Sequence, residues 1–208
     1  MPYYRKQPLV FAAALVCCIA LTAIADPGLA VGKVSGVGDA WTTVHFERSY
    51  NSMVVVATPN YSPSDLPLVP RIRNAEGNSF EIRLRAMADP PDAAPDENLD
   101  VHYIVAEEGV YTQGADGIKM EAVKYLTTTT YRKTAYTGDV RSYQQSYSQP
   151  VVVGQVMTYN DDRSSTFFAR GNSLNVPPSP TVLRLGKMSG EDASGRADET
   201  VGYIVFEA

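Results

Sequence analysis

A short apolar pattern occurs twice in this chain, about 100 residues apart, and it limits the folds that the chain can adopt. Residues 101–109 read VHYIVAEEG, and residues 201–208 read VGYIVFEA. Both copies are rich in valine, isoleucine and tyrosine, and both follow an acidic segment. Their length suits a β-strand and is too short for a typical helix. We therefore predict that the two copies are strands at equivalent positions of a duplicated unit.

A second pair of similar segments supports the duplication. Residues 49–56 (SYNSMVVV) match residues 146–153 (SYSQPVVV) at nearly the same offset. A period of this length suits a whole small β-domain rather than one turn of a solenoid. We predict two tandem antiparallel β-sandwich modules, at residues 26–135 and 136–208. The second copy ends sooner than the first, so either it closes differently or the chain belongs to a longer protein.

The rest of the chain predicts an all-β fold, because helical periodicity is almost absent and strand patterns alternate with turns. The clearest strand is 79–85, where Phe80, Ile82 and Leu84 alternate with charged residues. Met53 to Ala57 is uninterruptedly apolar and is predicted to be a central strand covered on both faces. Further strands are predicted at residues 44–47, 118–126, 140–147, 166–170 and 181–185. The glycine-rich residues 32–38 are predicted to be a lead-in, and the threonines 127–130 a connection.

The first 25 residues have the composition of an export signal. Arg5 and Lys6 precede an apolar run at residues 9–21, and Ala23-Ile24-Ala25 fits a signal-peptidase site. The apolar run is shorter than the roughly 20 residues that span a bilayer. We therefore expect residues 1–25 to be a cleaved signal peptide and the mature protein to be secreted or held at the cell surface, without a membrane span.

Removal of this leader also changes the chemistry of the chain. Cys17 and Cys18 lie within it, so the mature protein has no thiol and depends on its core for stability. Loss of Arg5 and Lys6 takes the net charge from -5 to -7. An acidic exported protein is a poor partner for nucleic acid or anionic lipid, so neither is expected.

Several of these segments together resemble H-type-lectin-like β-sandwich modules. The segments are the valine strand after a Ser-Tyr turn, residues 71–74 leading into 80–84, and residues 101–105. Residues 153–161 and 196–203 look like a module that accompanies the first in large exported bacterial proteins of an uncharacterised family. The resemblance covers the chain after the leader. It implies carbohydrate binding, to sugars such as N-acetylgalactosamine, and assembly as a homo-oligomer.

No catalytic constellation accompanies these segments. A serine hydrolase needs a histidine beside its nucleophile, and the only histidines are His45 and His102, both predicted to point outward from strands. Glu107 and Glu108 are adjacent on a strand, so they face opposite sides and cannot flank one glycosidic bond. They are interpreted as a strand end entering solvent. Two histidines without a mature cysteine also disfavour zinc. We predict that the protein is not an enzyme.

Polar residues that a simple sandwich does not require accumulate in the second copy. Strand ends and loops at one edge of a sandwich commonly carry binding groups. The predicted ligand-binding residues are Gln155, Tyr159, Asn160, Asp161, Arg170, Lys187, Asp192 and Arg196. We expect Asp161→Ala and Arg170→Ala each to weaken ligand or calcium binding tenfold or more, about 1.4 kcal/mol, and to leave the fold intact. The alternative is a structural network of salt bridges, since buried charges must be paired.

Two further features bear on the ligand. Residues 160–162 and 190–199 concentrate oxygen ligands that suit calcium, although Asn-Asp pairs are also ordinary turn formers. No cofactor is predicted, and calcium stays an open alternative. Trp41, Tyr61 and Tyr159 lie at predicted strand ends, where a ring can stack on a sugar or close the core. We expect a tandem-repeat, non-catalytic module that binds glycans or cell-surface or matrix components. The alternative is a structural or adhesive part of an extracellular assembly.

Overall fold

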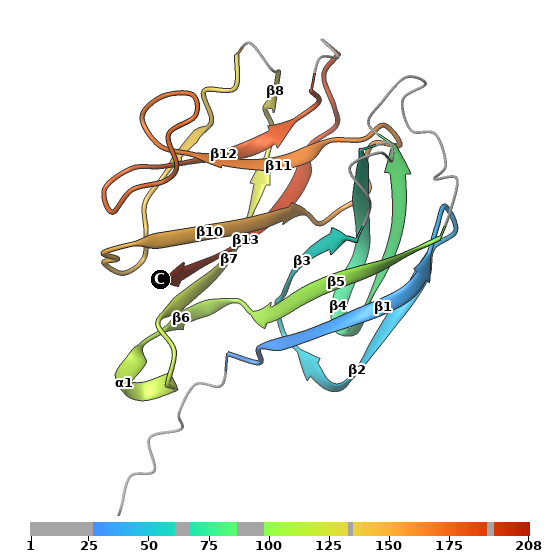
Figure 1. The fold of residues 1–208 in the computed structure, drawn as a ribbon, viewed down its shortest axis with the longest axis horizontal. Coiled ribbons are helices and arrows are strands. Elements are labelled where there is room, and N and C mark those ends of the chain that lie inside the picture. The colour runs from blue at the N-terminus through green and yellow to red at the C-terminus, as the bar shows by residue number, and fades with distance from the viewer. Residues whose placement is uncertain (1–26, 61–66, 87–97, 133–134, 191–193) are drawn as a thin grey trace, which may run out of the picture.

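The computed structural model of the protein describes residues 27–60, 67–86, 98–132, 135–190 and 194–208. In this part of the chain the fold is all-β, as predicted, with thirteen strands in several mostly antiparallel sheets and one short helix (Figure 1). The predicted signal peptide at residues 1–25 lies outside the described residues, as do Tyr61 and Asp192. Among the described residues, no helix has the length and apolar character needed to cross a bilayer.

The first half of the fold, residues 27–107, contains two sheets. One sheet has the order β1-β5-β3, formed by β1 (Ala30–Val37), β5 (Leu99–Glu107) and β3 (Met53–Pro59). The other pairs β2 (Thr42–Tyr50) with β4 (Leu68–Ala86). Asn74 and Gly77 have positive φ angles of 50° and 58°, and the Arg73 side chain bonds Glu81. An extended strand would place residues 73 and 81 more than about 25 Å apart, so β4 reverses direction and has two arms.

The second half, residues 109–208, also contains two sheets. One has the order β10-β13-β7-β6, formed by β10 (Pro150–Val156), β13 (Glu199–Glu207), β7 (Met120–Thr127) and β6 (Gly109–Tyr111). The other joins β11 (Thr166–Arg170), β12 (Leu183–Met188) and β8 (Thr130–Tyr131), with β9 (Asp139–Arg141) also on β12. Helix α1 (Gln113–Asp116) links β6 to β7. It begins at Thr112, whose side chain accepts from Ala115 N, and ends at the left-handed Gly117.

The repeated sequence corresponds to a repeated strand pairing. Met53 lies opposite Glu107 in the pair β3–β5, and Pro150 lies opposite Glu207 in the pair β10–β13. Each pairing then continues over seven residues without a shift of register. The backbone bonds that flank the two pairs also correspond: Glu108 N donates to Ser52 O, and Ala208 N donates to Gln149 O, at 2.8 and 3.1 Å. The two patterns found in the sequence therefore form the same antiparallel pair in each half.

The opposite sheets correspond as well. Thr42 of β2 lies opposite Ile82 in the second arm of β4, and Asp139 of β9 lies opposite Leu185 of β12. The strand orders β1-β5-β3 and β7-β13-β10 are then equivalent. Strand β7 falls within residues 26–135, the predicted first module, yet it hydrogen-bonds β13 and β6 of the second half.

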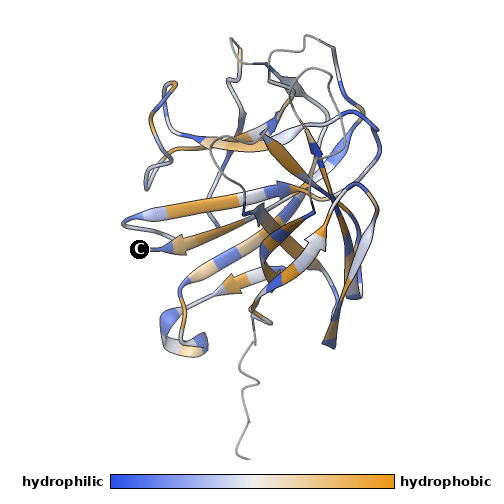
Figure 2. Ribbon diagram, turned by 45° about the vertical axis from the view of Figure 1, so that its right-hand side comes forward, coloured by the Kyte–Doolittle hydropathy of each residue, from blue (hydrophilic) through white to orange (hydrophobic). Residues whose placement is uncertain are grey.

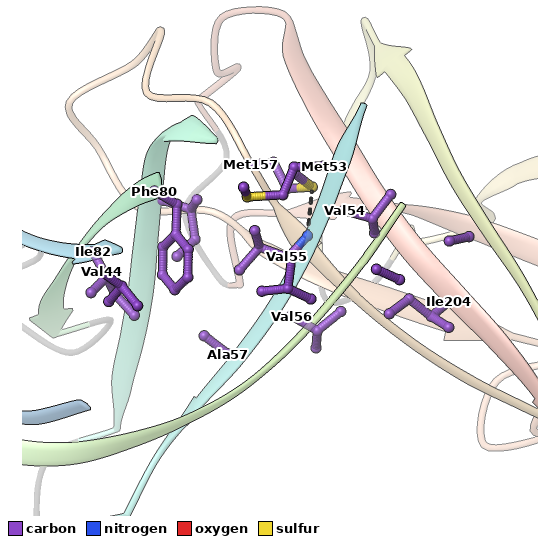
Figure 3. Packing of buried hydrophobic residues seen from close by; sticks show 14 of the residues in the cluster. Val44, Met53, Val54, Val55, Val56, Ala57, Phe80, Ile82, Met157 and Ile204 are labelled. Carbon is purple, nitrogen blue, oxygen red and sulfur yellow. Dashed lines mark hydrogen bonds between the residues drawn. The ribbon is translucent and has the colours of Figure 1, made fainter. Parts of the chain in front are cut away.

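The strand β3 lies at the junction between the halves. Its residues Met53 to Ala57 are buried, although β3 hydrogen-bonds only β5 and is therefore an edge strand rather than a central one. One face packs against the first-half core around Phe80, and Val54 on the other face lies toward Ile204 of β13 (Figure 3). Val55 N also contacts the sulfur of Met157 at 3.4 Å. One hydrophobic core thus runs across both halves.

Figure 2 shows the same distribution, with hydrophobic positions gathered on the strands in the middle of the molecule and a mostly hydrophilic helix α1. Two glycines allow the strands to approach closely. A Cβ atom at Gly202 of β13 would collide with the Met157 sulfur, and one at Gly32 of β1 would collide with the Tyr103 ring. The close approach at Gly32 explains why β1 is a strand, although its glycine content predicted a lead-in. The predicted strand 140–147 is shorter than expected and corresponds only to β9.

Candidate functional site

Three of the predicted ligand-binding residues contact the first half of the fold. The buried Gln155 donates from Nε2 to the carbonyl oxygen of Pro70 at 2.8 Å. Arg71, which is 1% exposed, donates to the carbonyl oxygens of Asp161 and Asp162 at 2.6 and 3.2 Å. Its guanidinium also lies over the Tyr159 ring, 4.6 Å from the centroid. These contacts join β10 and the loop after it to β4.

The buried carboxylate of Glu199 holds that loop in place. It accepts hydrogen bonds from the hydroxyl of Thr158 and from the backbone N–H groups of Asn160 and Asp161, the latter two at 3.1 Å. Asn160 donates in turn from its side chain to the carbonyl oxygen of Asp198 at 2.8 Å. Glu199 therefore acts as the centre of the loop, because its one carboxylate joins three groups of residues 158–161.

The carboxylate of Asp161 is also satisfied within the protein. It accepts from Nε and Nη2 of Arg163 and from the backbone N of Ala197, each at 2.9 Å. The bonded Arg163 guanidinium is the main reason why the pKa of Asp161 lies well below its usual range. In the described part of the chain, no three His, Cys, Asp or Glu residues are placed to hold a metal ion together. Calcium binding by residues 160–162 would need to displace Arg163.

The cations of the second-half cluster donate mainly to backbone carbonyl oxygens. Lys187 is 0% exposed, and its Nζ lies 3.0 Å from Thr127 O and 2.6 Å from Ala197 O. Desolvation lowers its pKa, against the opposing effect of nearby carboxylates, of which Glu199 is the strongest. Arg196 donates to the carbonyl oxygens of Ser164 and Ser194 at 3.2 and 3.1 Å. Lys187 and Arg196 therefore cross-link the loops around residues 127, 164 and 197.

Arg170 lies apart from these residues, at the end of β11. Its guanidinium donates to the carbonyl oxygens of Gly171, Asn172 and Tyr136 at 3.1, 2.9 and 2.9 Å. The predicted site thus brings together Asn160, Asp161, Lys187 and Arg196 but leaves out Arg170. Because most of their polar atoms bond the backbone, these residues match the structural network stated as the alternative. Their ligand-binding role stays a prediction.

A different group of side chains lies on the outer face of the β2–β4 sheet. Arg73 and Arg83 of β4 both lie over the Trp41 ring, with Cζ 4.1 and 4.7 Å from its centroid. Arg83 also lies over Tyr159 at 4.6 Å and donates to its hydroxyl. Trp41 and Tyr159 meet edge to face, with centroids 5.3 Å apart. We call these residues, together with Arg71, the arginine–aromatic ladder.

The alternation of β4 explains why the ladder forms on this face. Phe80, Ile82 and Leu84 are fully buried, so Glu81 and Arg83 point to the opposite side. Glu81 bonds Nε of Arg73 at 2.7 Å and the side chain of Asn74 on the other arm. The bonded Arg73 is the main cause of the lowered pKa of Glu81. One carboxylate thus holds the two arms of β4 together beneath the arginines.

The ladder combines half-buried rings with an excess of positive charge. Among the described ion pairs, the guanidinium groups of Arg73 and Arg83 have one carboxylate partner, namely Glu81 on Arg73. The Arg73 side chain is 35% exposed. Nε of Arg83 is buried without a hydrogen-bond acceptor. Aromatic faces beside guanidinium donors can stack on a flat ligand ring and bond its polar groups, so the ladder is a candidate binding surface.

A small cleft includes the chain neighbours of two ladder residues, Arg73 and Tyr159. It has a volume of about 230 Å³ and is lined by Asn74, Ala75, Glu76, Lys124, Met157, Thr158 and Thr200. Asn74 follows Arg73 in the chain, and Thr158 precedes Tyr159. The cleft lies where the β4 turn meets β7, β10 and β13, so both halves contribute polar groups to it.

Residues considered for catalysis have other positions. His45 of β2 and His102 of β5 are exposed and belong to different sheets. Glu107 accepts hydrogen bonds from the backbone N atoms of Asn51 and Ser52 at 2.9 and 2.6 Å. Glu108 accepts from the hydroxyl of Ser52. Strand β5 does end at Glu107, but the pair does not simply enter solvent, because both carboxylates bond the turn before β3.

Comparison with known proteins gives one similarity. No family model matches the chain, and no solved structure matches it. The chain is 32% identical over 173 residues to halomucin of Haloquadratum walsbyi (strain DSM 16790 / HBSQ001). This match covers 79% of the chain and 2% of halomucin, so the chain spans only a small part of that protein's length.

Proposed function

We propose that this protein is an exported, non-catalytic binding protein that recognises a glycan, or another cell-surface or matrix component, at the arginine–aromatic ladder and the adjoining cleft. The observation that carries the proposal is the edge-to-face pair of Trp41 and Tyr159, with the guanidinium groups of Arg73 and Arg83 against these rings on the outer face of a sheet. Aromatic rings that present a face beside polar groups are suited to sugar rings, which have both apolar C–H faces and hydroxyl groups.

We further propose that the chain is built of two tandem β-sandwich modules. The equivalent strand orders and the matched registers of β3–β5 and β10–β13 support this proposal. We place the division at Glu108, between β5 and β6, because β7 is hydrogen-bonded to β13. The shared hydrophobic core and the contacts of Arg71 and Gln155 would hold the modules in one orientation. The ladder and the cleft both depend on this orientation.

An extracellular location is supported by two independent features. Residues 1–25 have the composition of an export signal. The similarity to halomucin, a protein named as a mucin, agrees with an extracellular location. The sequence places neither of its two histidines beside a recognisable nucleophile motif, which supports a binding rather than a catalytic role.

A structural or adhesive role in an extracellular assembly is the second candidate. It is favoured by the match to a short stretch of a far longer protein. A groove of about 520 Å³ on the outer face of β1, β5 and β3 also presents Val31, which is 72% exposed, together with Ile104 and Val153. Apolar surface of this kind is typical of contacts between proteins.

A glycan array probed with the whole exported chain tests the proposed function. We expect selective retention on a subset of glycans, and loss of at least tenfold in affinity for Trp41→Ala and Tyr159→Ala. Tyr125→Ala is the matched control, because Tyr125 is another half-buried tyrosine beneath a guanidinium, that of Arg141 at 4.4 Å. Retention of no glycan, or equal binding by all three variants, would contradict the proposal.

A further inference from the structure

We propose that the arginine–aromatic ladder selects acidic saccharides, by binding a sugar-borne carboxylate or sulfate through Arg73 and Arg83 while the sugar ring stacks on Trp41 or Tyr159. This inference rests on the proposed function of glycan recognition and names the ligand class. It follows from how the three ladder arginines differ in their partners.

Arg71 is committed to the fold. It is almost fully buried, and its guanidinium donates to two carbonyl oxygens of the loop after β10. Arg73 is half-exposed and shares Glu81 with Asn74. Arg83 donates to the uncharged hydroxyl of Tyr159 and forms no ion pair with any of the described residues. The site therefore carries more positive charge than its own carboxylate neutralises.

Other arginines of the protein show what a structural guanidinium looks like in this fold. Arg170 donates to three carbonyl oxygens, and Arg163 donates to a carboxylate, a hydroxyl and a carbonyl oxygen. Arg83 lacks such a set: its described acceptor is the Tyr159 hydroxyl, and its Nε is buried without one, as are those of Arg85 and Arg184. More than nine in ten buried polar groups have a partner, so this half-buried guanidinium is suited to a further acceptor from a ligand.

An oxyanion on a sugar fits both parts of the ladder. The planar fork of arginine matches the two oxygens of a carboxylate or sulfate, and charge-assisted hydrogen bonds are about twice as strong as neutral ones. The Trp41 and Tyr159 rings supply apolar surface for the C–H face of the same sugar. A neutral sugar would gain the stacking and hydrogen bonds to its hydroxyl groups but would leave the excess charge unpaired. The chain as a whole is acidic, so the positive charge at the ladder is local.

Isothermal titration of the whole exported chain with three polymers tests the inference. Dextran sulfate supplies sulfate groups, polygalacturonate supplies carboxylates, and dextran is the neutral control. We expect at least one acidic polymer to bind tenfold or more tightly than dextran, and its affinity to fall as salt concentration rises. The acidic polymer that binds identifies whether the oxyanion is a sulfate or a carboxylate.

Variants localise the effect. Arg83→Gln and Arg73→Gln should each reduce the affinity for the acidic polymer tenfold or more. Arg141→Gln should leave it unchanged, because Arg141 lies over Tyr125 with a similar geometry but outside the ladder. Arg83→Lys retains the charge but loses the planar fork, so it should bind less tightly than the unmodified chain and more tightly than Arg83→Gln.

The outcomes separate this inference from the proposed function. Equal affinity for dextran and the acidic polymers, or equal losses in Arg141→Gln and Arg83→Gln, overturns the acidic selection. So does failure of both acidic polymers to bind a chain that retains neutral glycans on an array. In each of these cases glycan recognition itself still stands, whereas a chain that retains no glycan at all overturns both.

Discussion

Lys187 occupies in the second half of the fold the position that Ala86 occupies in the first. Leu84 N donates to the carbonyl oxygen of Gly38 at 2.8 Å, and the backbone of Leu185 likewise lies against Gly138, so Ala86 and Lys187 each lie two residues after equivalent leucines. Both side chains are fully buried. The first half fills this position with an apolar side chain, and the second half fills it with an ammonium group that cross-links two loops through carbonyl oxygens.

Replacing this buried cation should be costly. We expect Lys187→Met to destabilise the protein by about 3 kcal/mol, because the buried Glu199 loses a nearby cation and two carbonyl oxygens lose their donor. Leu84→Met, a change of similar volume at a fully buried apolar position of the first half, should cost less than about 1.5 kcal/mol. Urea denaturation measures both values. A Lys187→Met protein as stable as the Leu84→Met protein would show that the ammonium group is not needed.

Arg170 and Asp161 should now behave differently from the sequence-based expectation. The guanidinium of Arg170 donates to three carbonyl oxygens and lies outside the ladder, so Arg170→Ala should lower the free energy of unfolding by about 2 kcal/mol and leave binding unchanged. Asp161→Ala should destabilise the loop after β10 and weaken binding indirectly, through Tyr159. Parallel measurements of melting temperature and glycan affinity distinguish the effects of the two substitutions. A tenfold loss of affinity in a stable Arg170→Ala protein would support the original site instead.

Alkaline pH should destabilise the second half. Burial is the main cause of the raised pKa values of Tyr131 and Tyr143, each about 12, and it also raises those of Tyr125, Tyr147 and Tyr203. An unfolded phenol ionises near 10, so the unfolded state releases protons first and stability falls as pH rises from 10 to about 12. Phenolate absorbance and circular dichroism should therefore change together. Phenols that ionise near pH 10 in a folded protein would contradict this.

Low pH should reduce the stability of the protein through protonation of Glu207. Its ion pair with Lys119 is the main cause of a pKa lowered to about 2, and the N–H groups of Ser148 and Gln149 also bond it. The stability that it contributes is present above its ordinary pKa of 4.5 and is lost as pH falls through about 2. Glu207→Gln should therefore flatten the acid side of the stability profile.

Hydrogen exchange provides the local measurement for the same prediction. In Glu207→Gln the amides of Ser148 and Gln149 should exchange faster, whereas those of Asn51 and Ser52, which Glu107 caps in the first half, should be unchanged. Glu107→Gln should show the reverse pattern. Equal exchange at all four amides in both variants would mean that the carboxylates do not hold these turns.

Local pattern was enough to predict the strands of the core. Phe80, Ile82 and Leu84 alternate with charged residues, and the structure buries all three. The same reasoning missed β1, because the close contact between Gly32 and the Tyr103 ring is tertiary and leaves no local pattern. It also could not distinguish a central strand from β3, an edge strand that is covered on both faces by the two halves.

The candidate site, too, could be predicted from the sequence only in part. The acidic and basic residues of the second half do gather, since Asp161 and Lys187 both bond Ala197, but they bond mainly the backbone. The ladder joins Trp41 to Tyr159 from opposite halves of the chain, so no sequence spacing could reveal it. The available signal was the arginines on alternate positions of β4, at 71 and 73 and again at 83 and 85.

Trp41 is the single tryptophan of the chain, and its fluorescence tests the central claim most directly. Trp41 lies within the ladder, against Arg73, Arg83 and Tyr159. A glycan that binds there should shift the emission of Trp41 and protect it from iodide quenching, with a midpoint equal to the dissociation constant from calorimetry. Saturable glycan binding that leaves the emission and quenching of Trp41 unchanged would contradict the account and place the site elsewhere.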